Sequence, residues 1–588
     1  MFFYNYNSLT TEEISKKLGQ APVAQGGGAI PSLAGKTLKI TLDGGVTLEK
    51  GPALEYAFLS DGMLTLSEDG AAGVTGPYRG IELGEVTLFT HLIPGTQRGY
   101  NVIIDGRGLV TVVEVWFSGF DEKREVQREV YFGYVGGGEI PEKRHSLTNR
   151  VEGKGFHWKD CTGFETLVFY PSVTYSTLVE LSPARGGLTI AAPSDYIKID
   201  DRFFIYDRVE CEFSGTFTLD VVDLFTVKSA GVRLGFDEND ALEYRVFTAD
   251  GEITGQAATF EPVGDYGTKI ADTYAEHGSA PVKGARAVYR PRLMHTDLTK
   301  EQVKAALAKP GMIFAGSSIM TGSNNMEPTD YLAGKKFTLS FDTSRSYEWE
   351  RGFKDGDVSE SRKIPGDIVW EYEVSDAKTL KWRAEGASAW SEEAYQAFEP
   401  AKDIILFSHV HTGSENGRCV TLAVDFTTRL ATCIDAQVGS WRSDWEIGHC
   451  AIFGVLKADG IRPPETKRHH HTTELVGKSF TWDYGMNVSS IHVYSTPESY
   501  SWTIFMSNGS GGMTWSAPCI YVKLRDDAYL FSWVEEKCNG NQGVMVFNPN
   551  IMHDAGYFYG MSENGVSLTT LGAFSRTAGE FDILKHFK

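Results

Sequence analysis

Residues 9–18, LTTEEISKKL, are matched by residues 298–307, LTKEQVKAAL, and the agreement between the two halves of the chain continues from there. An internal repeat of this length constrains the fold more than any single motif, because each copy must form the same unit. Further matching segments are LAGKTLKITLD (33–43) with LAGKKFTLSFD (332–342), LEYAFLSD (54–61) with WEYEVSDA (370–377), YRGIE (78–82) with YQAFE (395–399), LFTH (88–91) with LFSH (406–409), and the RH dipeptides at 144–145 and 468–469. The repeat predicts a tandem duplication.

Each copy is predicted to contain a short helix followed by two β-rich modules. Thr10 with Glu13, and Thr299 with Gln302, have the spacing of a capping box, which indicates the start of a helix. The predicted domains are 1–135 (helix and first module), 144–256 (second module), 331–458 (third module) and 468–588 (fourth module). A linker over 257–330, rich in Gly, Ala, Ser and Pro, carries the second helix.

The modules consist of short segments of alternating apolar residues separated by Gly, Asp, Asn or Pro, such as KTLKITLD and LVTVVEVWF. This pattern predicts antiparallel strands, about eight in roughly 110 residues. A meandering sheet of that size removes its exposed edges by closing on itself, and a small barrel can hold one small ligand. Aromatic residues make up 12% of the chain, which suits half-buried strand faces and ring-lined pockets. The predicted class is all-β.

Composition argues against several classes of partner. The formal net charge is −21, from 56 Lys and Arg against 77 Asp and Glu, so we expect no binding to nucleic acid or to anionic membranes. The N-terminal segment lacks the features of a secretory signal, and the seven cysteines include no CxxC pair. Reduced thiols and a cytoplasmic location are therefore expected. The oligomeric state stays open.

Two stretches, AYQAFEPAKDIILFS (394–408) and the region from HTTELVGKSFTWDY to GYFYG (471–560), resemble the MoaF family, named as molybdenum cofactor biosynthesis protein F. That family pairs an N-terminal with a C-terminal lipocalin-like (calycin) barrel. The resemblance covers roughly 331–577 well and the first copy more weakly. It implies two MoaF-like units in tandem, hence four calycin-type antiparallel barrels with a short helix before each unit. His409 departs from the family pattern, in which an acidic residue usually takes this position.

A histidine recurs in the matching LFTH and LFSH strands. Because alternate strand residues share a face, Phe89 lies beside His91, and Phe407 beside His409 and His411. If that face points inward, each barrel holds an imidazole beside a phenyl ring, and His is the usual acid–base group near neutral pH. The alternative is a structural histidine that hydrogen-bonds to a carbonyl.

The pentads YRGIE and YQAFE add a tyrosine and a glutamate to each histidine. Tyr78 and Glu82, like Tyr395 and Glu399, are four residues apart and share a strand face one short turn before the histidine strand. Tyr, Glu and His are therefore predicted to meet in one pocket, where a desolvated Glu could act as acid or base. The alternative is a tyrosine at the barrel rim and a solvated glutamate.

Weaker candidates complete the predicted site. They are Tyr56 and Tyr372 from the repeated EY dipeptides, Glu114 and Asp435 from a later strand, the pairs Tyr196 with Lys198 and Tyr521 with Lys523, and Trp533 with Glu535. The run RHHH (468–471) has poor spacing for a metal, since adjacent residues of an extended chain point to opposite sides. No metal, nucleotide or flavin motif occurs, so we predict no cofactor.

These features predict a protein that binds a hydrophobic or aromatic small molecule. The first hypothesis is a cofactor-free enzyme of lyase or isomerase type, acting by dehydration, decarboxylation, cyclisation or a double-bond shift. The alternatives are a non-catalytic carrier and an accessory factor in molybdenum cofactor assembly. At most one copy is expected to be fully active, and we favour the second, because His411 extends its histidine face.

Overall fold

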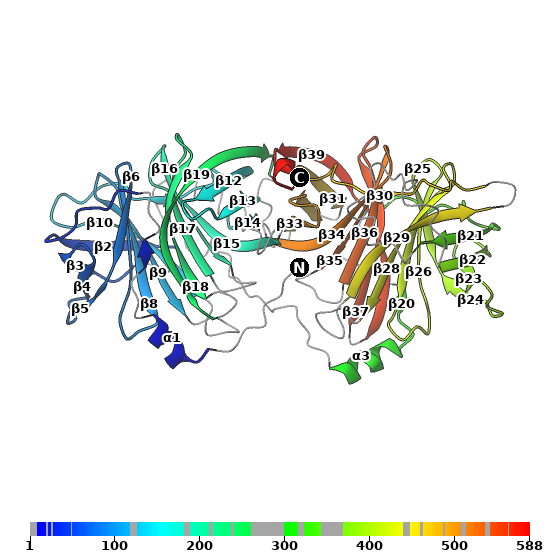
Figure 1. The fold of residues 1–588 in the computed structure, drawn as a ribbon, viewed down its shortest axis with the longest axis horizontal. Helices are drawn as coiled ribbons and strands as arrows, with labels where there is room; N and C mark the ends of the chain where they lie inside the picture. Colours follow the sequence, from blue (N-terminus) through cyan, green and yellow to red (C-terminus); the bar gives the residue numbers. More distant parts are fainter. Residues whose placement is uncertain are drawn as a thin grey trace.

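The computed structural model describes residues 9–18, 22–24, 28–46, 48, 50–117, 126–181, 188–210, 216–236, 240–259, 299–315, 323–342, 368–438, 447–458, 462–485, 488–506, 513–535, 541–562 and 564–587. Over these residues the fold is all-β, built from several barrel-shaped sheets (Figure 1). The α-helices of the described residues are α1 (Thr11–Lys17) and α3 (Lys300–Leu307).

Both helices begin where the capping boxes predict. In α1 the Glu13 amide donates to Thr10 Oγ1 at 3.2 Å, and the Thr10 amide donates to the Glu13 carboxylate at 2.8 Å. In α3 Gln302 and Thr299 make the same two hydrogen bonds, at 3.2 and 2.8 Å. The local helix signal in each copy is therefore confirmed.

The first module forms a nine-stranded antiparallel sheet in the order β5-β4-β3-β2-β10-β9-β8-β7-β6. Its strands are β2 (Thr37–Gly45), β3 (Leu54–Ser60), β4 (Met63–Glu68), β5 (Val74–Pro77), β6 (Arg79–Leu83), β7 (Val86–Leu92), β8 (Arg98–Ile104), β9 (Leu109–Phe117) and β10 (Val126–Val135). The two edge strands, β5 and β6, are separated by Tyr78 alone. One bent segment thus supplies both edges and curls the sheet into a barrel shape.

The third module repeats this plan in the order β24-β23-β22-β21-β29-β28-β27-β26-β25. Its strands are β21 (Lys336–Phe341), β22 (Ile368–Val374), β23 (Thr379–Ala384), β24 (Ser391–Ala394), β25 (Gln396–Ala401), β26 (Ile404–Val410), β27 (Cys419–Asp425), β28 (Leu430–Val438) and β29 (Ile447–Lys457). Tyr395 alone separates the edge strands β24 and β25, as Tyr78 does in the first module.

The second module closes into a ring of eight strands, because β19 pairs with both β18 and β12. Its strands are β12 (Lys154–Asp160), β13 (Glu165–Phe169), β14 (Tyr175–Glu180), β15 (Leu188–Lys198), β16 (Phe203–Glu210), β17 (Thr216–Asp223), β18 (Lys228–Phe236) and β19 (Leu242–Ala257). Short strands β1 (Val23–Ala24) and β11 (Ser146–Leu147) pair with β19 and β15.

The fourth module is a second ring, with β38 paired to β37 and β39 paired to β31. Its strands are β31 (Lys478–Gly485), β32 (Val488–Val493), β33 (Ser499–Met506), β34 (Met513–Arg525), β35 (Ala528–Val534), β36 (Asn541–Asn548), β37 (His553–Ser562), β38 (Gly565–Leu571) and β39 (Phe574–Phe581). The single strand β19 of the second module thus corresponds to β38 and β39 together. Strands β20 (Met312–Ile313) and β30 (His470–His471) pair with β38 and β34, and a 3-10 helix (Leu584–Phe587) follows β39.

The repeated RH dipeptide joins the two modules of each copy. Arg144 and Arg468 donate to Asp43 and Asp342, at 3.0 and 2.9 Å respectively. His145 and His469 are buried, and the Nδ1 of each lies 2.8 Å from a threonine hydroxyl, that of Thr111 or of Thr432. The dipeptide has a structural role, which accounts for its presence in both copies.

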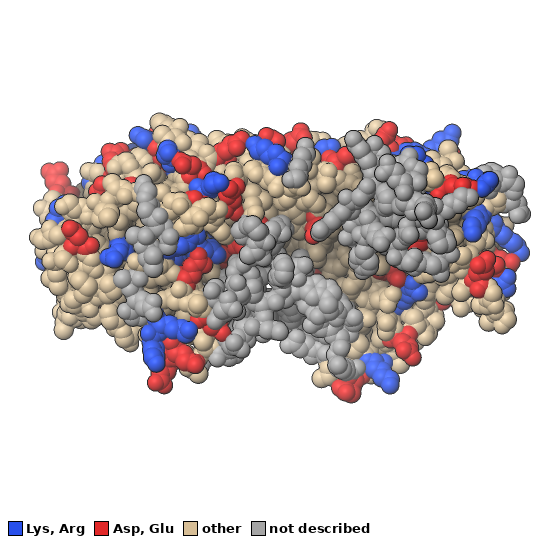
Figure 2. Space-filling view, in the orientation of Figure 1, with Lys and Arg blue, Asp and Glu red and all other residues tan. Residues whose placement is uncertain are grey.

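The two copies lie end to end, with the second and fourth modules in the middle (Figure 1). Strands β19 and β39 pair across this junction, and Thr189 of β15 lies 2.5 Å from the Ser499 hydroxyl. Figure 2 shows acidic and basic side chains interspersed over one face of the molecule. Among the described residues, no helix is long and apolar enough to cross a membrane.

Candidate functional site

In both copies the repeated histidine pairs with a tyrosine inside its sheet. His91 Nε2 lies 3.2 Å from the Tyr56 hydroxyl, and His409 Nε2 lies 3.3 Å from the Tyr372 hydroxyl. All four side chains are buried, the histidines on β7 and β26 and the tyrosines on β3 and β22. The tyrosines ranked as weaker candidates in the sequence are therefore the direct partners of the histidines.

Rings surround each histidine–tyrosine pair, as expected for an inward-facing strand. Phe89 and Tyr56 have ring centroids 5.2 Å apart, and Phe407 and Tyr372 have centroids 5.9 Å apart, with the rings edge to face in both cases. Such contacts add to the burial of apolar area. Phe89 and Phe407 thus lie where the strand pattern places them.

Tyr78 and Tyr395 also point inward, but their hydroxyl groups bond elsewhere. The Tyr78 hydroxyl donates to the Ser60 carbonyl at 3.2 Å, and the Tyr395 hydroxyl donates to the Asp376 carbonyl at 2.9 Å. Each ring fills the point where the sheet curls closed. Their geometry serves sheet closure rather than contact with the imidazoles.

The predicted meeting of Glu82 and Glu399 with the histidines does not occur. Glu82 pairs with Thr87, four residues before His91 on β7, which is about 13 Å along a strand. The register of β25 shifts between Phe398 and Ala401, and Glu399 accepts the Asp403 amide at 2.9 Å. Sharing a strand face did not bring these carboxylates to the pocket.

Glu114 and Asp435, in contrast, occupy matching positions, each in an ion pair with a partly exposed arginine. Arg98 donates through Nε to Glu114 at 2.7 Å, and Arg418 donates through Nε and Nη2 to Asp435, both at 2.8 Å. The second pair is bidentate, the stronger geometry. Both carboxylates are therefore already engaged by an arginine.

Burial governs the protonation of the histidine–tyrosine pairs. Desolvation lowers the pKa of His91 and of His409 to about 3, and it raises the pKa of Tyr56 and Tyr372 well above the ordinary value. At neutral pH each pair is therefore an uncharged imidazole beside an uncharged phenol. It can exchange hydrogen bonds with a ligand, but the imidazole accepts a proton reluctantly.

The second copy carries a path of rings from the rim to this pair. Half-buried Trp382 stacks on His411, with centroids 3.8 Å apart, and His411 stacks on His409 at 5.1 Å. The Nε2 atom of His411 is buried and has no hydrogen-bond partner among the described residues. The residues at matching register positions in the first copy are apolar: Leu54 for Trp370, Leu66 for Trp382 and Ile93 for His411.

The other candidates have structural partners. The Tyr196 and Tyr521 hydroxyls are buried and donate to the carbonyls of Tyr175 and Ser499. Lys198 and Lys523 form ion pairs with Asp201 and Glu474 at the surface. Trp533 Nε1 donates to Glu535 at 2.7 Å inside the fourth module.

Described cysteines and histidines give no metal centre. The described cysteines are free, and Cys211 and Cys538 lie outside the described residues. Over the part of the chain that the structure describes, no group of three or more His, Cys, Asp or Glu is placed to hold a metal ion.

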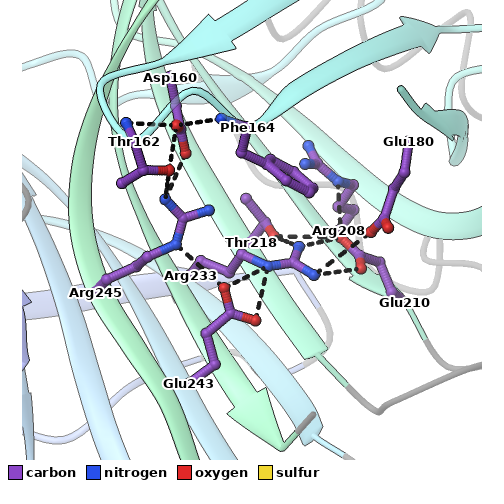
Figure 3. A network of polar contacts seen from close by, with 10 residues as sticks. All are labelled: Asp160, Thr162, Phe164, Glu180, Arg208, Glu210, Thr218, Arg233, Glu243 and Arg245. Carbon is purple, nitrogen blue, oxygen red and sulfur yellow. Dashed lines mark hydrogen bonds and ion pairs between the residues drawn. The ribbon is translucent and has the colours of Figure 1, made fainter. Parts of the chain in front are cut away.

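A pocket that the sequence reading missed lies inside the ring of β12–β19. Its cavity volume is about 30 Å³, and the pocket opens to solvent. Its lining includes Arg208, Arg233 and Arg245, which form the polar network of Figure 3 with four carboxylates. The available signal was an arginine between apolar or aromatic residues in two strands, GVRLGF and EYRVF.

The second copy of the repeat matches two known family domains. Residues 316–440 match the MoaF N-terminal domain, and residues 469–580 match the MoaF C-terminal domain. No curated protein matches the chain. Barrel-shaped sheets with these domains fit a role in small-molecule binding or one related to MoaF. With both domains present in family order, the chain is a MoaF-like protein.

Proposed function

We propose that the sheet β21–β29 binds a small aromatic molecule and recognises one of its polar groups. The observation that carries this proposal is the path from Trp382 through His411 and His409 to Tyr372. Within this path, the buried Nε2 of His411 has no hydrogen-bond partner among the described residues. An unsatisfied buried polar atom costs roughly 1–3 kcal/mol, and a ligand that hydrogen-bonds to it removes that cost.

The chemistry of the path defines the ligand class. Trp370 and Trp382 supply ring faces, while His411 is held neutral because burial lowers its pKa to about 2. A neutral imidazole nitrogen recognises a hydroxyl or amine better than an ionic group. The preferred ligand is thus a flat aromatic molecule with one neutral donor or acceptor.

A pair of related compounds tests this binding. We expect 1-naphthol to bind more tightly than naphthalene by roughly threefold to tenfold, the value of one neutral hydrogen bond. Fluorescence quenching of the tryptophans measures both affinities. His411→Ile, which copies the residue of the first sheet, should abolish the preference, and His91→Phe is the matched control that should keep it. Equal affinity for both compounds in the natural protein would refute the proposal.

The finer proposal is that this site is catalytic, as a cofactor-free lyase or isomerase. It is favoured by the hydrogen-bonded Tyr372–His409 pair, through which a proton can pass between a bound molecule and the imidazole. Mass spectrometry of a co-purified ligand would supply a substrate. His409→Ala should then lower turnover by roughly 10²–10⁴-fold, and His91→Ala should have little effect. Glu399→Gln should be silent, because Glu399 caps the Asp403 amide.

The non-catalytic carrier remains the simpler version of the same site. It is favoured by the pKa of His409, about 3, which is far from the near-neutral value that suits an acid–base group. If the protein binds the co-purified ligand but does not convert it, the site is that of a carrier.

We also propose that the four modules are calycin-type barrels in two tandem MoaF-like units, bounded at 1–135, 144–256, 331–458 and 468–588. The identical strand order of β2–β10 and β21–β29 supports this, as do the rings β12–β19 and β31–β39. Separate expression of residues 299–588 tests it. The expected product is folded and unfolds cooperatively.

A further inference from the structure

Three arginines lie in one row across neighbouring strands of the β12–β19 ring. Arg208 on β16 pairs with Thr218 on β17, Thr218 pairs with Arg233 on β18, and Arg233 pairs with Arg245 on β19. Directly paired residues project from the same face of a sheet. The three guanidinium groups therefore project into one lumen, where they line the pocket. Figure 3 shows their polar contacts.

The three arginines differ in how many of their guanidinium nitrogens donate a hydrogen bond. All three nitrogens of the buried Arg233 are engaged by carboxylates, Nε by Glu243 at 3.1 Å and Nη1 and Nη2 by Glu210 at 2.7 and 3.1 Å. Arg208 uses Nε and Nη1 in two long contacts of 3.4 Å, and Arg245 uses Nε and Nη1. Within the described residues, Nη2 of Arg208 and Nη2 of Arg245 have no partner.

Aromatic rings complete the pocket. Phe164 lies beneath both Arg233 and Arg245, at 5.5 and 5.6 Å from the ring centroid, and Trp158 and Phe247 line the same space. Gly231 makes room for this packing, because a Cβ there would lie 2.6 Å from the Phe247 ring. The pocket thus combines free guanidinium donors with flat apolar walls.

The fourth module shows that this type of ring does not need the arginines. Its row at the same register reads Trp533, Gly543, Phe558 and Thr569 in place of Arg208, Thr218, Arg233 and Arg245. Buried ion pairs are often no more stabilising than apolar residues of similar volume. Packing alone therefore does not explain three arginines in the second module, which favours a ligand.

We infer that the β12–β19 pocket binds a small carboxylate with a flat apolar body. A guanidinium presents paired N–H groups that match a carboxylate, and the two free Nη2 groups supply such donors on the pocket wall. Asp220, whose pKa burial raises, lies 3.4 Å from Arg208 and adds less negative charge than an ordinary aspartate. This site is separate from the one proposed in β21–β29.

Matched acids and amides test the inference. Isothermal titration calorimetry of the whole chain with benzoate and phenylacetate, and with benzamide and phenylacetamide, compares charged and uncharged versions of the same rings. At least one acid should bind about tenfold or more tightly than its amide, as expected for hydrogen bonds to a charged donor. Arg245→Gln and Arg208→Gln should each remove roughly tenfold of that affinity.

Arg202→Gln is the control, since Arg202 bonds Asp223 on the outside of the same ring and is partly exposed. It should bind the acids as the natural protein does. Thermal unfolding shows whether each variant is folded, and if one arginine variant is not, the other decides. The inference is overturned if neither acid binds, if acids and amides bind alike, or if both arginine variants retain full affinity.

Discussion

Asp554 gives the sharpest test of the electrostatics of this fold. Its side chain is fully buried in the β31–β39 ring, where Oδ1 accepts the Ala573 amide at 2.6 Å and Oδ2 has no partner in the part of the chain that the structure describes. Desolvation raises its pKa from 3.8 to about 8, and the Ala573 hydrogen bond offsets only part of that rise. At neutral pH the folded protein therefore holds a neutral carboxyl in this position.

The sign and size of the effect follow from proton linkage. Because the folded pKa exceeds the unfolded one, the folded chain binds more protons, and stability falls as pH rises from about 4 to about 8. Each pKa unit is worth about 1.4 kcal/mol, so the free energy of unfolding falls by roughly 4 kcal/mol between pH 4 and pH 7, and by roughly 6 kcal/mol in total above pH 8.

Asp554→Asn removes this titration while keeping an acceptor for the Ala573 amide. The difference in unfolding free energy between variant and natural protein should grow in the variant's favour by about 1.4 kcal/mol per pH unit across that window. Calorimetric unfolding at a series of pH values measures the difference, and infrared difference spectra detect the protonated carboxyl directly. A difference that does not change with pH, or a carboxylate band at pH 6, would refute the reasoning.

Two further predictions concern stability. Arg233→Met should destabilise the folded chain by about 3–5 kcal/mol in chemical denaturation, because the buried Glu210 carboxylate loses its 2.7 Å ion pair with Arg233; adding Glu210→Gln should recover part of the loss, and full additivity would contradict this. The pKa of His409 is about 3 in the folded protein, so the folded protein loses stability as pH falls below about 6.5. His409→Gln should therefore reduce the pH dependence of the unfolding free energy between pH 6 and 4, and an unchanged midpoint of acid unfolding would count against this.

Local signals in the sequence predicted the elements that depend on local spacing. Thr10 with Glu13 identified the start of α1, and the strand alternation placed Phe407 and His409 on an inward face. These features need only neighbouring residues, so one sequence suffices to find them.

Contacts across the lumen were harder to predict. Tyr372 reaches His409 from β22, a strand that is not adjacent to β26, and no spacing along the chain reports that approach. The Glu399 prediction assumed a regular strand, whereas the register of β25 shifts just there. The arginine row depends on the register of four strands at once, which a single sequence does not reveal.

The two copies share the residues that join their modules but differ in the residues that line their lumens. The residues that clasp the modules of each copy are the same in both, Arg144 with His145 and Arg468 with His469, and so are their threonine and aspartate partners.

The lumens differ. Arginines line the ring of the second module, and tryptophan and phenylalanine replace them in the fourth. His411 of the third module takes the place of Ile93 of the first. If the lumens served only packing, the constraint that kept the clasp would have kept them alike. Their divergence on a shared backbone instead fits separate ligands in separate modules, so the probes for β21–β29 and for β12–β19 should not compete. Competition between 1-naphthol and benzoate, measured by titration of one in the presence of the other, would argue for a single shared site.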